Sequence, residues 1–259
     1  MRFLAICLSI SLEVTLSAVG QGTSFYAPFD SPPYALQHVD HMNELIKSLH
    51  DDTELPEKTP LIDEFPWKSW MTVSNYSFGK DRGGIPMIAD LNALHPYFRD
   101  KIFELIRICK SKGIELAVVE SFRTHAKQNE YKSMGKKYTR SSGGGSKHQY
   151  GLAVDVVPII DSVADWHNYS VWKKVGAVGE KLGLRWGGRW KHMYDPGHFE
   201  WTAGLSSYHL AAGKFPKIPK PQLYPCLEED LSQLISFWQS WETEQSTMAS
   251  QKSEQGKMK

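Results

Sequence analysis

The 259-residue sequence contains little cysteine and no excess of either charge. Lysine and arginine total 30, aspartate and glutamate total 29, and the formal net charge is +1. This balance gives no electrostatic reason to expect nucleic acid or another charged polymer as a partner. Beyond the N-terminal apolar run, no segment approaches the roughly 20 apolar residues that a membrane-spanning helix needs. We therefore expect neither nucleic-acid binding nor stable membrane insertion.

The three cysteines form neither a metal-binding motif nor an evident disulfide framework. Cys7 lies in the N-terminal apolar run, so Cys109 and Cys226 are the two to consider. Cys109 falls on the same helical face as Ile102 and Leu105, which predicts a buried free thiol. Spacing alone does not establish whether Cys109 and Cys226 form a disulfide.

Residues 1–20 have the pattern of a secretory signal peptide. A basic start at Arg2 precedes an apolar run, and small residues surround Ala18, near which cleavage is expected. The mature chain should therefore be exported, and we expect it to be a monomer.

The remaining chain divides into three parts. Residues 21–84 form an N-terminal extension with one amphipathic helix over 36–49. Residues 85–215 carry helical and strand patterns in alternation and form the main domain. Residues 216–259 contain a proline-rich linker, a helix over 227–241 and a polar tail that we expect to be disordered.

A candidate metal-binding segment runs from Ser146 to Asp155. The range 152–157 is apolar and mostly β-branched except for Asp155, which predicts a short buried strand. A lone carboxylate in such a strand is costly unless a metal ion or an arginine neutralises it. Gly151 lets the chain bend between His148 and the strand, so that His148 and Asp155 can point at one spot.

A second segment, Asp195–Trp201, supplies another imidazole. Pro196–Gly197 predicts a turn that folds Asp195 back towards His198. His198 and Glu200 then alternate with aromatic residues, as in a strand that has one functional face and one packing face.

Two imidazoles and a carboxylate are the ligands that a catalytic divalent metal with one open position requires. We predict that His148, Asp155 and His198 bind Zn²⁺ and that Asp195 is the base that acts on the bound water. One histidine and one aspartate seven positions apart are, taken alone, more often a hydrogen-bonded core pair. The two segments together favour the metal site, with Glu200 as the alternative base.

These residues resemble a known family. The pattern Ser-x-His-x-x-Gly-x-Ala-x-Asp over Ser146–Asp155 and the pattern Asp-x-x-His-Phe-Glu over Asp195–Glu200 are similar to those of the zinc D-alanyl-D-alanine peptidases of bacterial cell walls. That family includes D,D-carboxypeptidases of the vancomycin-resistance type and L-alanyl-D-glutamate endopeptidases. The run Trp186–Trp190, and an aspartate three residues before His198, look most like the endopeptidase branch. The resemblance covers roughly Ile85–Trp201.

The resemblance implies an α+β fold with a small, mainly antiparallel sheet, helices packed on one side and a zinc cleft along the sheet, as in the D,D-peptidases and the Hedgehog signalling domain. It implies a zinc metallopeptidase that hydrolyses peptidoglycan stem peptides, with the L-alanyl-D-glutamate bond favoured. Two alternatives stay open: a D-alanyl-D-alanine carboxypeptidase and a non-catalytic, zinc-stabilised binding module. A bacterial protein, periplasmic or secreted, fits these functions.

The family pattern also indicates Arg123, which follows a predicted strand over 114–119 and would bind substrate or support the oxyanion. On the sequence alone, a surface arginine paired with Glu120 or Glu130 is the favoured interpretation. Three weaker candidates share a position near the predicted cleft and are proposed substrate contacts: Gln128, Ser146 and His192.

Overall fold

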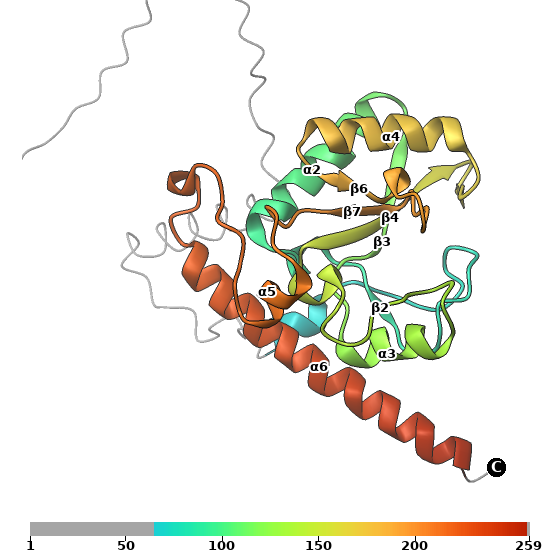
Figure 1. The fold of residues 1–259 in the computed structure, drawn as a ribbon. Helices are drawn as coiled ribbons and strands as arrows, with labels where there is room; N and C mark the ends of the chain where they lie inside the picture. Colours follow the sequence, from blue (N-terminus) through green and yellow to red (C-terminus); the bar gives the residue numbers. More distant parts are fainter. Residues whose placement is uncertain (1–64, 258–259) are drawn as a thin grey trace, which may run out of the picture. The chain divides into compact units, whose positions relative to one another are not determined.

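The computed structural model describes residues 65–257, so the predicted signal peptide and the helix predicted over 36–49 lie outside the described part of the chain. Its centre is an antiparallel five-stranded sheet (Figure 1). In order across the sheet, the strands are β3 (Glu115–Glu120), β4 (Ala153–Ile160), β7 (His198–Glu200) and β6 (Arg185–Trp186), with β5 (Val163–Ala164) paired to β4. A separate two-stranded sheet pairs β1 (Thr72–Val73) with β2 (Met87–Ile88).

Helices lie on both sides of the five-stranded sheet. In Figure 1, α2 (Pro96–Ser111) and α4 (Tyr169–Lys181) lie above it, and α3 (His125–Ser133) and α6 (Leu227–Lys257) lie below it. The other helical elements are short: α5 (Ser207–Ala211) and the 3-10 turns η1 (Pro66–Ser69), η2 (Leu91–Ala93), η3 (Lys147–Tyr150), η4 (Gly187–Arg189) and η5 (Pro221–Leu223). The α+β fold with a mainly antiparallel sheet is confirmed. The pair α2 and α4 is the helical layer that the sequence predicts on one side.

The sequence of α2 shows why this layer forms. Phe98, Ile102, Leu105 and Cys109 recur at helical spacing, and all four are fully buried against the sheet and α4. Cys109 is a free buried thiol, as predicted, and Cys226 is also free and lies at the surface.

Strand β4 lies at the middle of the fold and carries one of the candidate ligands. Six of its eight residues are buried, because it is paired along both edges and covered on both faces. Its pairing places Asp155 opposite His198 of β7 on one side and opposite Glu120 of β3 on the other. Residues that lie opposite each other in an antiparallel pair have neighbouring side chains on the same face.

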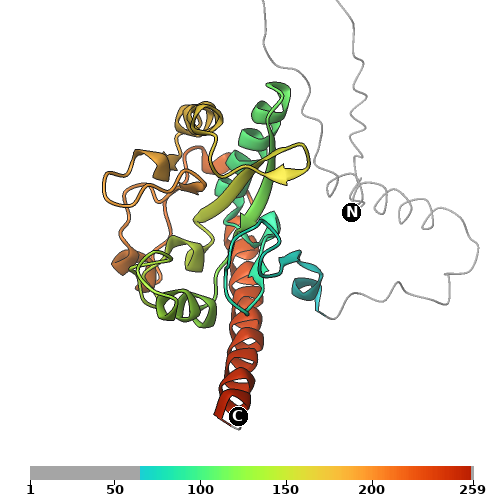
Figure 2. The same cartoon turned by 90° about the vertical axis from the view of Figure 1, so that its right-hand side faces the viewer.

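The C-terminal helix corrects one expectation. The sequence predicts a disordered tail after Trp241, whereas α6 continues to Lys257 and runs as one long helix (Figure 2). That prediction is wrong because the polar segment makes tertiary contacts that its composition does not reveal. Gln245 is buried, accepts a hydrogen bond from the Thr124 hydroxyl at 2.7 Å, and donates one to the Pro86 carbonyl at 2.9 Å.

An aromatic cluster joins α6 to the rest of the domain. The ring of Trp67 in η1 lies 5.2 Å from that of Trp241, and the ring of Trp238 stacks on Phe122 at 5.2 Å and 3°. The indole N–H of Trp238 also donates to the Ala93 carbonyl at 2.9 Å. Segments on either side of the predicted main domain thus belong to the same compact unit as the sheet.

Replacing Trp238 by alanine should lower the free energy of unfolding by about 3–5 kcal/mol, the usual range for a buried tryptophan. The change removes the ring stacked on Phe122 and leaves the Ala93 carbonyl without its donor. Chemical denaturation followed by circular dichroism measures the loss. Gln239→Ala, at an exposed position of the same helix, is the control and should change stability by less than about 0.5 kcal/mol. Equal effects of the two changes would show that α6 adds nothing to the core.

Candidate metal centre

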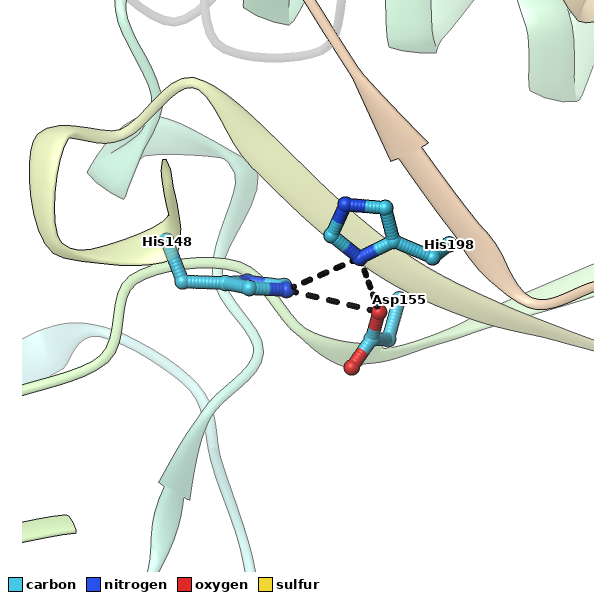
Figure 3. A group of neighbouring side chains, drawn as sticks. All are labelled: His148, Asp155 and His198. Atoms are coloured by element: carbon cyan, nitrogen blue, oxygen red, sulfur yellow. Dashed lines mark hydrogen bonds and ion pairs between the residues drawn. The ribbon is translucent and has the colours of Figure 1, made fainter. Parts of the chain in front are cut away.

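Three side chains converge beside the central strands (Figure 3). Nε2 of His148 lies 3.3 Å from Nδ1 of His198 and 3.4 Å from Oδ1 of Asp155, and Nδ1 of His198 lies 3.0 Å from the same oxygen. Each residue is at most 9% exposed. Ligands of a tetrahedral zinc ion, at about 2.0–2.1 Å from the metal, lie about 3.3 Å from one another. The three atoms therefore have the spacing that a single divalent ion requires.

The backbone brings these side chains together from η3, β4 and β7. Gly151, which follows His148, has φ of +60°, and a Cβ there would lie only 2.6 Å from the ring of Trp238. Both facts require glycine, so the bend predicted at this position is present. The β4–β7 pairing then sets Asp155 beside His198. The structure thus brings together the three residues that the two sequence segments predict as ligands.

Each imidazole has a partner on its other nitrogen. Nδ1 of His148 lies 2.9 Å from the carbonyl oxygen of Ser121, and Nε2 of His198 lies 3.2 Å from Oε2 of Glu200. When those nitrogens carry the protons and donate them, Nε2 of His148 and Nδ1 of His198 are left with lone pairs that face Asp155. This arrangement suits two histidines that bind one metal ion.

The charges around the three residues favour a bound cation. Burial alone would raise the pKa of Asp155, but the charges of His148 and His198 and their hydrogen bonds hold it well below its usual range. Burial would lower the pKa of His198, yet its bonds to Asp155 and Glu200 raise it to about 10. The pKa of Glu200, against the effect of burial, falls to about 2 because of its bond to His198. A metal ion would replace the proton on His198 as the positive charge of this group.

Arg123 lies next to Asp155. Its guanidinium is hydrogen-bonded to Glu120, donates to Oε1 of Gln128 at 3.1 Å, and lies 3.5 Å from Oδ2 of Asp155. Glu120 is fully buried, and its charge raises the pKa of Arg123 although burial opposes that shift. Glu120 is one of the two partners that the sequence suggests for Arg123. The arginine is buried, however, and not at the surface.

Asp195 lies in the turn that precedes β7. Its N–H donates to the carbonyl of Gly187 at 3.2 Å, and its own carbonyl accepts from the N–H of His198 at 3.2 Å. A Cβ at Gly187 would lie 2.4 Å from the Asp195 carbonyl, so this close approach requires glycine. Burial and the charge of Asp155 raise the pKa of Asp195, against the opposite effect of the two histidines. The shift has the direction that suits a general base.

The other predicted site residues have different surroundings. Gln128 is fully buried, and its Nε2 donates to the Ser141 carbonyl at 2.8 Å, so it fixes the loop before η3. Ser146 directly precedes η3, and its N–H donates to Oε1 of Gln149 at 3.3 Å. His192 is exposed, and no hydrogen bond or ion pair joins it to the three candidate ligands.

Comparison with known proteins bears on this arrangement. A protein-family model described as D-alanyl-D-alanine carboxypeptidase matches residues 139–201, which contain all three candidate ligands and Asp195. The chain is 30% identical over 121 residues to the peptidoglycan L-alanyl-D-glutamate endopeptidase CwlK of Bacillus subtilis (strain 168), and the alignment covers 41% of this chain and 72% of the relative. The chain belongs to this family of cell-wall metallopeptidases.

Two further peptidases resemble the chain. The L-alanyl-D-glutamate peptidase of Listeria phage A118 is 29% identical over 117 residues, which cover 44% of this chain and 40% of the phage protein. The crystal structure of the Serratia marcescens L-Ala D-Glu endopeptidase ChiX is 27% identical, with a TM-score of 0.38, and the match covers 44% of this chain and 84% of that one.

Sequence reasoning does not identify two neighbours of the metallopeptidase's histidines. One is the carbonyl of Ser121, which any residue type would supply and which therefore leaves no signal in the sequence. The other is Trp190, whose ring centroid lies 5.0 Å from that of His198. The run Trp186–Trp190 is noticed in the sequence only as a family resemblance, and the ring contact is the physical feature behind its last position.

Two Glu–Arg pairs of this metallopeptidase, each with its two residues three positions apart, allow a matched comparison of buried and exposed charges. Glu120→Ala removes the nearer of the two carboxylates beside buried Arg123 and leaves only Asp155, at 3.5 Å, so the free energy of unfolding should fall by about 3 kcal/mol, the lower end of the range for breaking a buried ion pair. Glu104→Ala removes the partner of Arg107, which is exposed to solvent, and should lower the stability far less than Glu120→Ala does. Chemical denaturation of both variants measures the difference, and losses of equal size would contradict the buried pair.

Proposed function

We propose that the chain is an exported zinc peptidase that hydrolyses peptidoglycan stem peptides at the L-alanyl-D-glutamate bond. CwlK of Bacillus subtilis and the peptidase of Listeria phage A118 each carry the name of a peptidase of that bond. The family match and the convergence of His148, Asp155 and His198 support metal-assisted amide hydrolysis as the reaction.

The orientation of the two imidazoles is the observation that carries the metal assignment. The Ser121 carbonyl and the Glu200 carboxylate each lie within hydrogen-bond distance of one ring nitrogen, and the other nitrogen of each ring faces Asp155. A set of two nitrogens and one carboxylate oxygen is typical of catalytic zinc, which keeps one position open for water. The ion, when bound, would lower the pKa of that water and polarise the scissile carbonyl.

Asp195 is the proposed general base. Among the described residues no hydrogen bond engages its carboxylate. Glu200, the alternative, bonds to His198 and accepts from Arg185 at 2.7 Å. A base needs a free lone pair to take a proton from water and pass it to the leaving amine. Asp195 meets that requirement, and Glu200 is assigned to orienting His198.

The remaining candidates are assigned to substrate binding or to positioning. Arg123 holds Asp155, and its unused N–H groups are proposed to contact the substrate carbonyl. Ser146 and His192 are proposed to contact the peptide from the segments that lead to the two histidines. Gln128 bonds to Arg123 and is assigned to fixing that side chain.

Hydrolysis of peptidoglycan takes place outside the cytoplasm, so the proposal includes export to the periplasm or the medium through the signal peptide predicted over residues 1–20. No helix in the described range of 65–257 is both long and apolar enough to cross a membrane. The chain is proposed to act as a monomer.

A D-alanyl-D-alanine carboxypeptidase is the second candidate, because the matching family model carries that description. The two activities use the same metal chemistry and differ in the bond that the cleft accepts. A zinc-stabilised binding module is less well supported, since a structural site does not need the unpaired carboxylate of Asp195 beside it.

Incubation of the zinc-loaded chain with defined muropeptides, analysed by mass spectrometry, tests the proposal. Fragments with a new N-terminal D-glutamate are the expected products. Loss of a single alanine would replace the proposal with the carboxypeptidase. Intact peptides, with zinc measured in the protein, would replace it with the binding module.

Substitutions should separate the base from the ligands. Asp195→Ala should retain zinc and lose about 10²–10⁴-fold in cleavage rate, because only the proton transfer is removed. His148→Ala should lose zinc, as measured by metal analysis after dialysis. His192→Ala, a histidine outside the ligand set, is the control and should retain the metal. Full activity of Asp195→Ala would transfer the base role to Glu200.

A further inference from the structure

A loop from the N-terminal side of the main domain lies against the turn that carries Asp195. The indole N–H of Trp166 donates to the Phe78 carbonyl at 2.8 Å, which joins the loop Asn75–Ile85 to the segment before α4. The same indole ring lies beside Gly197, where an added Cβ would be 3.6 Å from Cζ3 of Trp166. Gly197 lies between Asp195 and His198, so Trp166 connects the loop to the proposed catalytic turn.

The loop places two cations over that indole ring. Nζ of Lys80 lies 3.7 Å from the centroid of the Trp166 ring, and the guanidinium carbon of Arg82 lies 5.3 Å from it. Cations within about 6 Å of an indole face are attracted to the ring, so Trp166 holds both groups at one place. The electrostatic effect of Lys80 extends to Asp195 and Asp155, and that of Arg82 extends to Asp195.

Charged side chains of α3 hold the backbone of the loop. Lys127 is 1% exposed, and its ammonium donates to the Arg82 carbonyl and, at 2.6 Å, to the Ile85 carbonyl. The carboxylate of Glu130 accepts from the N–H groups of Gly84 at 2.7 Å and of Ile85 at 3.1 Å. A buried lysine that binds backbone carbonyls fixes the loop before any ligand arrives, which lowers the entropic cost of binding.

Neither cation of the loop is neutralised by the described part of the chain. Asp81 lies between them in sequence, but its carboxylate accepts from Nδ2 of Asn75 at 3.1 Å and from the N–H of Gly83 at 3.0 Å. No ion pair joins Lys80 or Arg82 to an acidic residue within residues 65–257, and Nε of Arg82 is buried without a hydrogen-bond partner. Two adjacent cations without a counter-ion favour an anion that binds between them.

We propose that Lys80 and Arg82 form a carboxylate-binding subsite beside the catalytic turn, and that it takes the free carboxylate of the substrate's D-glutamyl residue. This inference rests on the proposed function. A glutamyl residue has two carboxyl groups, and the one that is not joined to the next residue remains an anion. In the L-alanyl-D-glutamate bond that anion belongs to the residue that supplies the leaving amine. The indole of Trp166 offers an apolar face to the neighbouring methylene groups.

The test compares two peptides that differ only in this group. Both contain the L-alanyl-D-glutamate bond, and the D-glutamyl residue carries either the free carboxylate or the neutral carboxamide. For the zinc-loaded chain, KM should be about tenfold lower for the acid than for the amide, the effect of one charge-assisted hydrogen bond. Lys80→Ala and Arg82→Ala should each abolish the preference, so that the ratio of the amide's KM to the acid's KM falls from about tenfold to within about twofold of one.

Lys68→Ala is the matched control, because Nζ of Lys68 also lies over an indole, 5.3 Å from the ring of Trp67, but in η1. It should leave both peptides unaffected. Calorimetry with the Asp195→Ala chain adds a measurement of binding without cleavage, in which the acid should bind about tenfold more tightly than the amide.

The outcomes distinguish this subsite from the proposed function. Cleavage of both peptides with equal KM, or an equal rise of both KM values in Lys80→Ala, would overturn the subsite and leave the peptidase intact. Cleavage of neither peptide by the unaltered chain would overturn the proposed function. In that case equal binding of acid and amide in the calorimeter would also overturn the subsite, whereas tighter binding of the acid that is lost in Lys80→Ala would support it as an anion site.

Discussion

The pairing of three antiparallel strands is the constraint on which the candidate site depends. Glu120 of β3 lies opposite Asp155 of β4, and Asp155 lies opposite His198 of β7, so the three side chains form one row across the sheet. A shift of one residue in either pairing would turn part of that row to the other face. The fully buried Val154 and Phe199, which are paired with each other, resist such a shift, because it would expose them. Core packing on one face of the sheet thus fixes the chemistry on the other.

This row buries two carboxylates and one imidazole, and these groups need hydrogen-bond or ion-pair partners. Arg123 is hydrogen-bonded to Glu120 and lies close to Asp155. The Ser121 carbonyl and the Glu200 carboxylate hold the two imidazole rings in their orientation. These paired groups fix the positions of the candidate ligands. Within residues 65–257, no ion pair joins Asp195 on the proposed catalytic turn, or either of the two cations over Trp166, to another side chain. In the proposed mechanism these unpaired groups act on the water and on the substrate, which explains why the chain leaves them unpaired.

Much of this organisation follows from local sequence, and some of it does not. The strand around Asp155, the bend at Gly151 and the turn before His198 are encoded by residues close to one another, and the structure has all three. Residues close in sequence do not predict that the polar tail is helical, because Gln245 is held by residues more than a hundred positions earlier. The role proposed for Lys80 could not be predicted from the sequence either, since its loop has neither periodicity nor a family motif. The sequence leaves two glutamates as partners of Arg123, and the structure pairs it with Glu120, while Glu130 bonds to Lys127 and to the N–H groups of Gly84 and Ile85.

Anomalous X-ray diffraction from crystals of the zinc-loaded chain is the measurement that tests the central claim most directly. The account predicts one zinc ion bound by Nε2 of His148, Nδ1 of His198 and the carboxylate of Asp155, with a solvent molecule as the fourth ligand. The carboxylate of Asp195 should face that solvent molecule without binding the metal. A zinc ion at another place would contradict the account, and so would a fourth position filled by Asp195 or Glu200, because a closed ligand set leaves no water to activate.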